Sequence, residues 1–196
     1  TTIERLVELM DLEVIEENIF RGESQDIGSP QVFGGQVLGQ ALMTATRTIE
    51  DRSVHSLHAY FLRRGDFEAP IVYEVDRARD GGSFSNRRII AVQHGEQIFN
   101  MTASFQKPEE GLEHQSEMPE VKGPDELEDL VDLIKPEWVE QLPGRIKRML
   151  TRERPFEVKP VETPHFLTNK TTEPIKHSLI KAKGVVPQHI GLHQAL

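Results

Sequence analysis

The chain has 196 residues, no cysteine and a formal net charge of −9 at pH 7. The missing cysteines exclude a disulfide scaffold, a thiolate metal site and a cysteine nucleophile. The lack of a long apolar run excludes a membrane-spanning helix within this sequence, and the acidic balance disfavours nucleic acid as a partner. We therefore expect a soluble protein of a reducing compartment.

The negative charge is concentrated in one segment. Residues 108–140 carry twelve acidic and two basic side chains together with four prolines, so the rest of the chain is nearly neutral. An acidic, proline-punctuated stretch is typical of a linker with short helices rather than of a packed domain. It divides the sequence into a first domain at 1–107, a linker at 108–153 and the start of a second domain at 154–196.

The first domain opens with a mixed run at 12–24, which we interpret as one strand. Apolar side chains at helical spacing then predict a long helix over 34–49. Three glycines and two alanines keep this helix slim at a cost in helix propensity. We therefore expect it to be packed tightly against a curved surface.

A β-meander follows the helix. Alternating side chains predict four strands, at 54–63, 70–79, 83–93 and 97–106. We expect tight turns at Asp80-Gly81-Gly82, with the glycines at positive φ, and at His94-Gly95-Glu96. One strand, one slim helix and antiparallel strands indicate an α+β fold. A strongly curved antiparallel sheet around one long helix is the hot-dog architecture.

The third part of the sequence repeats this order. Strand-like runs lie at 156–162 and 177–183, and a helix is predicted to begin within 188–196. The sequence stops there, before any meander. We therefore expect the second domain to be incomplete in this chain.

Residues Gly34, Gly35 and Gln36 open the predicted helix. Free amides at a helix N-terminus carry partial positive charge and can donate to a developing oxyanion, so these residues are candidates for substrate binding. The alternative is that the glycines only allow close packing of helix and sheet. The helix carries no Asp, Glu or His, so we do not expect the catalytic base on it, and a dehydratase with its acid there is disfavoured.

His55 is the best ionisable candidate of the first domain. By strict alternation it shares a strand face with Leu57, Ala59 and Phe61, which we assign to the helix side, whereas His58 faces outward. A buried histidine can have a pKa suited to a general base. The alternative is a hydrogen-bonded core histidine without a catalytic role.

Ser85 and Arg87 fall on one face of the strand that follows the Asp80 turn. An arginine beside a hydroxyl can bind a phosphate or a facing carboxylate, so both are candidate ligand-binding residues. The alternative is an internal ion pair at the strand end. No two histidines have the spacing of a known metal motif, so we expect no metal site.

Seven stretches together resemble a known family: EENIFRG (16–22), QVFGGQVLGQ (31–40), VHSLHAYFLRRG (54–65), RDGGSFSNR (79–87), MTASFQ (101–106), RPFEVKPV (154–161) and LHQ (192–194). In this order they resemble acyl-CoA thioesterase II. The resemblance implies a double hot-dog fold. It also implies hydrolysis of fatty acyl-CoA to free fatty acid and CoA, with no metal and no other cofactor.

The resemblance further implies a catalytic Asp near the end of the second domain's helix, with a Thr or Ser and a Gln on later strands. No position here matches them, so we expect them beyond Leu196, with the missing half of the second hot dog supplied by the same or another chain. We also expect a homo-oligomer in the bacterial cytoplasm or, as the second choice, the peroxisome. The alternative function is a non-catalytic acyl-CoA-binding or assembly module.

Overall fold

The chain folds into two units, which we describe separately from a computed structural model. The structure describes residues 2–140, 143–144, 147, 151–164, 167–168 and 171–196. The first unit, called the sheet unit, comprises Arg5–Gly111 and Val186–Leu196. The second, called the linker unit, comprises Leu112–Val185 with the first residues of the chain.

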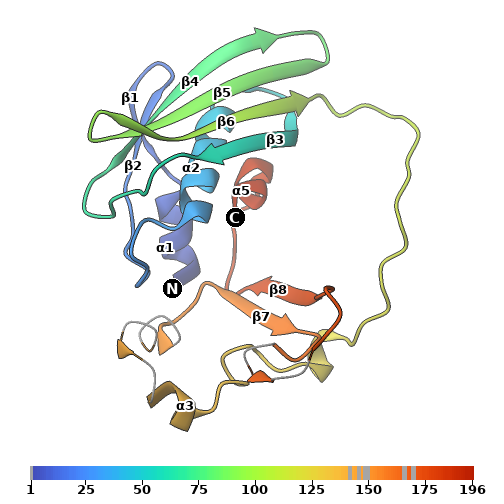
Figure 1. Cartoon of the computed structure of the whole chain (residues 1–196). Helices are drawn as coiled ribbons and strands as arrows, with labels where there is room; N and C mark the ends of the chain where they lie inside the picture. Colours follow the sequence, from blue (N-terminus) through green and yellow to red (C-terminus); the bar gives the residue numbers. More distant parts are fainter. Residues whose placement is uncertain (1, 141–142, 145–146, 148–150, 165–166, 169–170) are drawn as a thin grey trace. The chain divides into compact units, whose positions relative to one another are not determined.

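The sheet unit is a six-stranded antiparallel sheet with a central helix on one face (Figure 1). The strand order is β1-β2-β4-β5-β6-β3. The strands are β1 (Glu13–Glu16), β2 (Ile19–Gly22), β3 (Ser53–Phe61), β4 (Ile71–Asp80), β5 (Phe84–Gln93) and β6 (Glu96–Gln106). The helices are α1 (Thr2–Leu9), α2 (Gly34–Thr46) and α5 (Ile190–Ala195). Of α1, the residues from Arg5 onward belong to this unit. The predicted α+β hot-dog architecture is confirmed.

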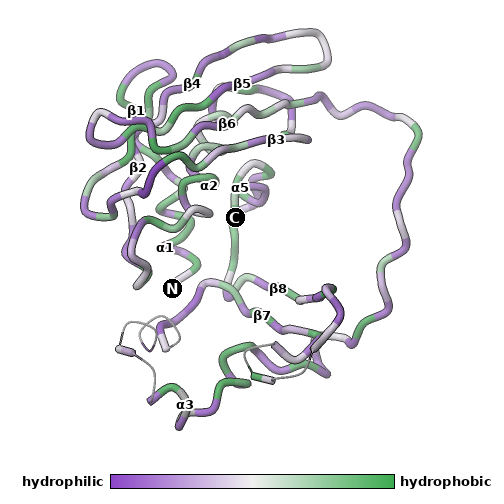
Figure 2. The backbone as a smooth tube through the Cα atoms, viewed as in Figure 1, coloured by the Kyte–Doolittle hydropathy of each residue, from purple (hydrophilic) through white to green (hydrophobic). Residues whose placement is uncertain are grey.

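The core lies between α2 and the strands that it contacts, β3 to β6. Alternate residues of the strands turn inward, and Figure 2 shows the resulting alternation of hydrophobic and hydrophilic positions. The fully buried apolar side chains of the sheet are Ile71, Tyr73, Ile89, Ala91, Phe99, Met101, Ala103 and Phe105. α2 contributes small residues to this interface: Ala41 and Ala45 are completely buried. The slim face therefore lets α2 sit close to the curved sheet, as predicted.

The stretch predicted as a single strand at 12–24 is a hairpin instead. β1 and β2 pair antiparallel around Asn18, whose φ is 62°. Asparagine tolerates this left-handed conformation better than most residues because its short polar side chain can bond locally. The run lacks a glycine at the turn, so hydrophobic alternation alone did not reveal it.

The two turns predicted between the meander strands differ in conformation. His94 and Gly95 both have positive φ, 52° and 76°, which is the type I′ pattern of a tight hairpin. Gly81 and Gly82 do not have positive φ, so the expected left-handed conformation at that turn was wrong. Glycine serves another purpose there, because a Cβ on Gly81 would lie only 3.0 Å from the backbone oxygen of Phe84.

The linker unit holds a two-stranded antiparallel sheet of β7 (Phe156–Pro160) and β8 (Ser178–Ala182), with the 3₁₀ turn η1 (Pro124–Glu126) and helix α3 (Pro136–Glu140). Ion pairs support it: Lys183 Nζ lies 3.3 Å from Asp129 Oδ2. The segment Val186–Leu196 is grouped with the sheet unit. The domain limits 1–107, 108–153 and 154–196 stay a prediction for the complete protein. None of the described helices has the length and hydrophobicity to cross a membrane.

Candidate functional site

A pocket of about 440 Å³ lies at the N-terminal end of α2. Apolar side chains, among them Val32, Phe61 and Ile98, line part of it. Arg63 and Arg64 also line it, and Arg63 is held by a 3.0 Å ion pair between its Nε and Glu96 Oε2. The pocket thus has both polar and apolar walls, with a positive component from the two arginines.

The first turn of α2 offers two unused backbone donors to this end of the helix. Phe33 precedes it in extended conformation, and its carbonyl accepts from the amides of Gln36 at 3.0 Å and Val37 at 3.4 Å. The amides of Gly34 and Gly35 have no acceptor within the part of the chain that the structure describes. Such amides carry the positive end of the helix dipole, so they can stabilise negative charge on a carbonyl oxygen.

Both glycines make room for aromatic rings. A Cβ on Gly34 would lie 3.1 Å from Phe61 Cε1, and a Cβ on Gly35 would lie 2.4 Å from Phe33 Cε1. Phe33 and Phe61 are more than half exposed. Two exposed aromatic rings therefore pack at these glycines. They place apolar surface beside the free amides.

The side chain of Gln36 is buried, and both ends of its amide are hydrogen-bonded within the chain rather than exposed to a ligand. It is buried; its Oε1 accepts from the amide of Gln25 at 3.2 Å and its Nε2 donates to the carbonyl of Glu23 at 3.1 Å. Both ends of its amide thus hold the segment that follows β2. Its assignment as a substrate-binding residue stays a prediction. Through these two bonds Gln36 positions the loop that follows β2.

Gln40, one turn further along α2, forms the buried centre of a second set of hydrogen bonds. Its Nε2 donates to the carbonyls of Leu9 at 2.8 Å and Glu23 at 2.9 Å, while its Oε1 accepts from Tyr73 Oη at 2.8 Å. Burial raises the pKa of Tyr73, so its hydroxyl remains a neutral donor. The network ties α1, the segment after β2, α2 and β4 together.

Arg87 is almost completely buried, and all five of its N–H donors are used. Nε donates to Thr48 Oγ1 at 2.7 Å, and Nη2 donates to the Thr48 carbonyl at 3.1 Å and to Asp80 Oδ1 at 2.7 Å. Nη1 donates to the carbonyls of Arg79 at 3.1 Å and Asn86 at 2.9 Å. No donor remains for a ligand. Of the two interpretations of this residue, the structure favours the internal ion pair.

Ser85 belongs to the same network. Its hydroxyl donates to Asp80 Oδ1 at 2.7 Å and accepts from Arg52, whose other nitrogen donates to the carbonyl of Gly81 at 2.7 Å. The hydrogen bonds from Ser85 and then Arg87 hold the pKa of Asp80 below its usual value. The motif RDGGSFSNR thus places Asp80 before the turn and its two hydrogen-bond donors, Ser85 and Arg87, after it. This arrangement matches the internal ion pair that was the alternative interpretation of the motif.

The predicted site residues do not form one site. Arg87 holds Thr48, just after the last residue of α2, whereas Gly34 begins the helix. Fourteen residues at 1.5 Å each separate these positions by about 20 Å. The Gly34 end is therefore the candidate site, and the Arg87 cluster is an anchor at the other end of the helix. Among the described residues, no group of three His, Asp or Glu side chains is placed to hold a metal ion.

His55 is exposed, and its assignment to the helix side was wrong. A β-bulge lies between Val54 and Ser56, so Val54 pairs with Phe105 while Ser56 pairs with Ser104. The extra residue shifts the alternation, and His55 Nε2 lies 2.9 Å from Ser104 Oγ. His55 therefore lies on the exposed face of β3, and its assignment as a catalytic residue stays a prediction.

The comparisons with known proteins agree with this fold. A family profile described as "Acyl-CoA thioesterase N-terminal domain" matches residues 21–106. The chain is 43% identical to "Acyl-CoA thioesterase 2" of Haemophilus influenzae over 99% of its length and 68% of the relative's. It is 39% identical to human "Acyl-coenzyme A thioesterase 8", covering 91% of this chain and 58% of the relative's.

Solved structures give the same result. An acyl-CoA thioesterase II of Mycobacterium marinum superposes with a TM-score of 0.72 at 36% identity, covering 97% of this chain and 64% of the other. A tesB protein of Mycobacterium avium subspecies paratuberculosis superposes with a TM-score of 0.76 at 25% identity, covering 100% of this chain and 67% of the other. The chain thus spans about three fifths to two thirds of these proteins. Fold, motifs and relatives agree: the chain belongs to the acyl-CoA thioesterase II family.

Proposed function

We propose that the complete protein hydrolyses acyl-CoA thioesters. The oxygen of a water molecule attacks the thioester carbonyl carbon, the carbon–sulfur bond breaks, and the water's protons pass to the leaving sulfur and to solvent. The products are a fatty acid and free CoA. Relatives named as acyl-CoA thioesterases over most of this chain support the substrate class.

The observation that carries the proposal is the pair of free amides at Gly34 and Gly35 beside a pocket with apolar and cationic side chains. As water adds, negative charge grows on the carbonyl oxygen, and donors fixed in advance stabilise it without reorganising. The apolar part of the lining suits the start of an acyl chain, and Arg64 suits an anionic part of the ester. The base that activates water belongs, by this proposal, to residues that follow Leu196.

The oligomeric state and compartment are part of the same proposal. We expect a homo-oligomer, because β3 is the last strand of the sheet and its outer edge is available for pairing in the described chain. We place the complete protein in the bacterial cytoplasm, as its bacterial relatives suggest, with the peroxisome as the second choice.

A single substitution tests the oxyanion role. Gly34 is the first residue of α2, where proline is well tolerated, and Phe33 before it has φ −66° and ψ 127°, the conformation that a following proline requires. Gly34→Pro therefore removes one N–H while keeping the helix. We expect kcat for acyl-CoA, measured as release of free thiol, to fall roughly 10²–10³-fold.

Gly34→Ala is the matched control, because it adds a side chain at the same place but keeps the amide. It should retain most of the activity, since the exposed ring of Phe61 can move aside. Equal kcat values for Gly34→Pro and the wild type would contradict the oxyanion role. A folded wild type that binds acyl-CoA without releasing thiol would contradict the hydrolase itself.

A further inference from the structure

Gln93, the last residue of β5, directs a buried side chain at one loop. It is 5% exposed. Its Oε1 accepts from the amide of Asp66 at 2.8 Å, and its Nε2 donates to the carbonyls of Asp66 and Ala69, each at 2.7 Å. The carbonyl of Pro70 lies 3.4 Å from the same Nε2. The amide of one buried side chain therefore bonds the backbone of loop 62–70, which connects β3 to β4.

Two further contacts hold this loop, but both differ from the Gln93 contact in kind. At its start, the amides of Leu62 and Arg63 share the carbonyl of Ile98 on β6, at 2.8 and 3.1 Å. In its middle, Asp66 Oδ2 lies 3.0 Å from Nε2 of His94, and both side chains are exposed. Exposed ion pairs contribute little. The buried amide at the end of β5 is therefore the main hold on the middle of the loop.

The loop in turn contacts the segment that enters α2. The carbonyl of Gly65 accepts from the amide of Val32 at 2.9 Å, and a Cβ on Gly65 would lie 3.1 Å from Val32 Cβ. Val32 is buried and stands two residues before Gly34, the first residue of α2. Both Val32 and Gly65 line the pocket of the candidate site. A shift of the loop therefore shifts the start of the helix.

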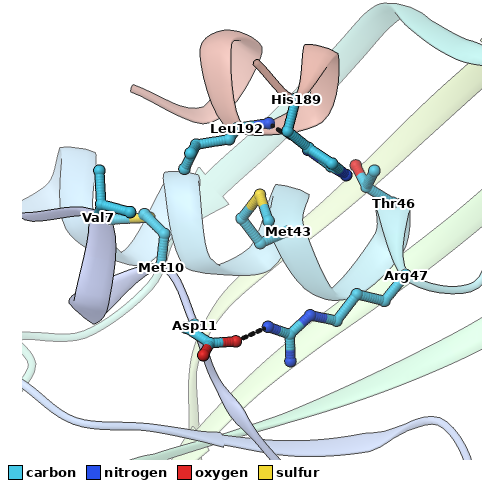
Figure 3. A pocket seen from close by; sticks show the side chains of 8 residues that line it. All are labelled: Val7, Met10, Asp11, Met43, Thr46, Arg47, His189 and Leu192. Carbon is cyan, nitrogen blue, oxygen red and sulfur yellow. Dashed lines mark hydrogen bonds and ion pairs between the residues drawn. The ribbon is translucent and has the colours of Figure 1, made fainter. Parts of the chain in front are cut away.

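The two ends of α2 are held differently. Figure 3 shows the ion pair of Arg47 with Asp11 beside a pocket of about 270 Å³ at the C-terminal end. Thirteen residues at 1.5 Å each place that contact about 20 Å from Gly34 along the helix. At the N-terminal end, the N-cap residue Phe33 makes no side-chain capping hydrogen bond. Helix ends fray where such a cap is missing, so the first turn needs a hold from outside the helix.

We propose that Gln93 is a positioning residue for thioester hydrolysis. Through loop 62–70 and the contact between Gly65 and Val32, it fixes the amides of Gly34 and Gly35 relative to the sheet. This inference rests on the proposed function. Donors that stabilise a developing oxyanion are effective because they are held in place before the reaction. A side chain that never touches the substrate thus affects the rate of the chemical step.

The first test is Gln93→Met in the complete protein. Methionine is unbranched and fills the same space, but it has no amide to bond the loop. Because a displacement of about 1 Å in reacting groups can cost 10²-fold, we expect kcat to fall about 10- to 100-fold. KM should stay within about threefold, since the lost stabilisation belongs to the transition state. Release of free thiol gives kcat, and urea unfolding gives the folded fraction by which it is divided.

The same substitution in the Gly34→Pro variant separates positioning from a general structural role. If Gln93 acts through the amides, its loss should cost at most about threefold more once the Gly34 amide is gone, because groups that act as a unit are not additive. A merely structural role would lower kcat by the same factor in both proteins. Equal factors would overturn the proposal.

Gly65→Ala perturbs the loop while leaving Gln93 in place. The added Cβ is closer to Val32 than ordinary contact, so Val32 must give by a few tenths of an ångström. We expect kcat to fall about threefold or more. Gly82→Ala is the matched control, because its Cβ would have no atom within 4 Å, and it should match the wild type. If Gln93→Met does not fold, this pair decides: a folded Gly65→Ala with full kcat overturns the proposal.

The two proposals fail in different ways. A folded wild type that releases no CoA overturns the proposed function and this inference with it. A wild type that releases CoA and loses activity in Gly34→Pro, while folded Gln93→Met keeps its full kcat, overturns this inference alone.

Discussion

Replacing Arg87 with alanine should destabilise the protein severely. The guanidinium is 1% exposed and makes five hydrogen bonds, including a 2.7 Å pair with Asp80. Hydrogen bonds to a charged group contribute about 1.5–3 kcal/mol each, but they are not additive, and removing one partner of a buried pair costs about 3–5 kcal/mol. The carboxylate of Asp80 is 55% exposed and can be hydrated again. We therefore expect a loss of about 3–4 kcal/mol.

The assay is urea unfolding followed by circular dichroism, with the slope m compared between variants. Arg87→Lys should recover less than half of the loss, because an ammonium group cannot reach acceptors on opposite sides as a planar guanidinium does. Arg88→Ala is the matched control: this neighbouring arginine is exposed, so its removal should change stability by no more than about 0.5 kcal/mol. If Arg87→Ala lost less than about 1 kcal/mol and raised KM for acyl-CoA instead, Arg87 would be a ligand-binding residue and the reasoning would fail.

The remaining predictions concern the other buried and charged contacts. Tyr73→Phe leaves Gln40 Oε1 without its buried donor, so it should lower the free energy of unfolding by about 1–2 kcal/mol, while Tyr60→Phe at an exposed position should have no measurable effect. The folded-state pKa of Asp80 lies below the usual 3.8. The contribution of Asp80 to stability is therefore complete above pH 3.8 and is lost as the pH falls through the lower, folded-state pKa. Asp80→Asn should therefore lose less Tm between pH 6 and pH 3 than the wild type; equal losses in the two proteins would contradict the role of Asp80.

Hydrophobic periodicity was sufficient for the helix and the meander. The pattern that predicted a helix over 34–49 matches α2 at Gly34–Thr46, and the four predicted strands match β3 to β6 within two residues at each end. Apolar faces dominate the energetics of these elements, so their order and length are readable from one sequence. The hairpin around Asn18 was missed because its turn depends on one backbone angle rather than on a pattern of burial.

The candidate site was less accessible to sequence reasoning. Glycines at 34 and 35 marked the helix start, but one-dimensional spacing could not show that Arg87 lies at the opposite end of the helix. The position of His55 depended on a bulge, which shifts the alternation by one residue and leaves no mark in the sequence. The close approach of Gly39 to the backbone oxygen of Ala195 joins residues distant in the chain, which no local pattern predicts.

The bulge in β3 also limits how this sheet can grow. β3 ends the strand order, and in the described chain no strand pairs on its outer side. Only beyond the bulge, over Ser56–Phe61, does the strand keep an unbroken register with β6. A bulge interrupts the regular row of N–H and C=O groups that an incoming strand needs. A strand added to this edge therefore pairs over about 20 Å, six residues at roughly 3.4 Å each, which favours a short, specific junction over open-ended stacking.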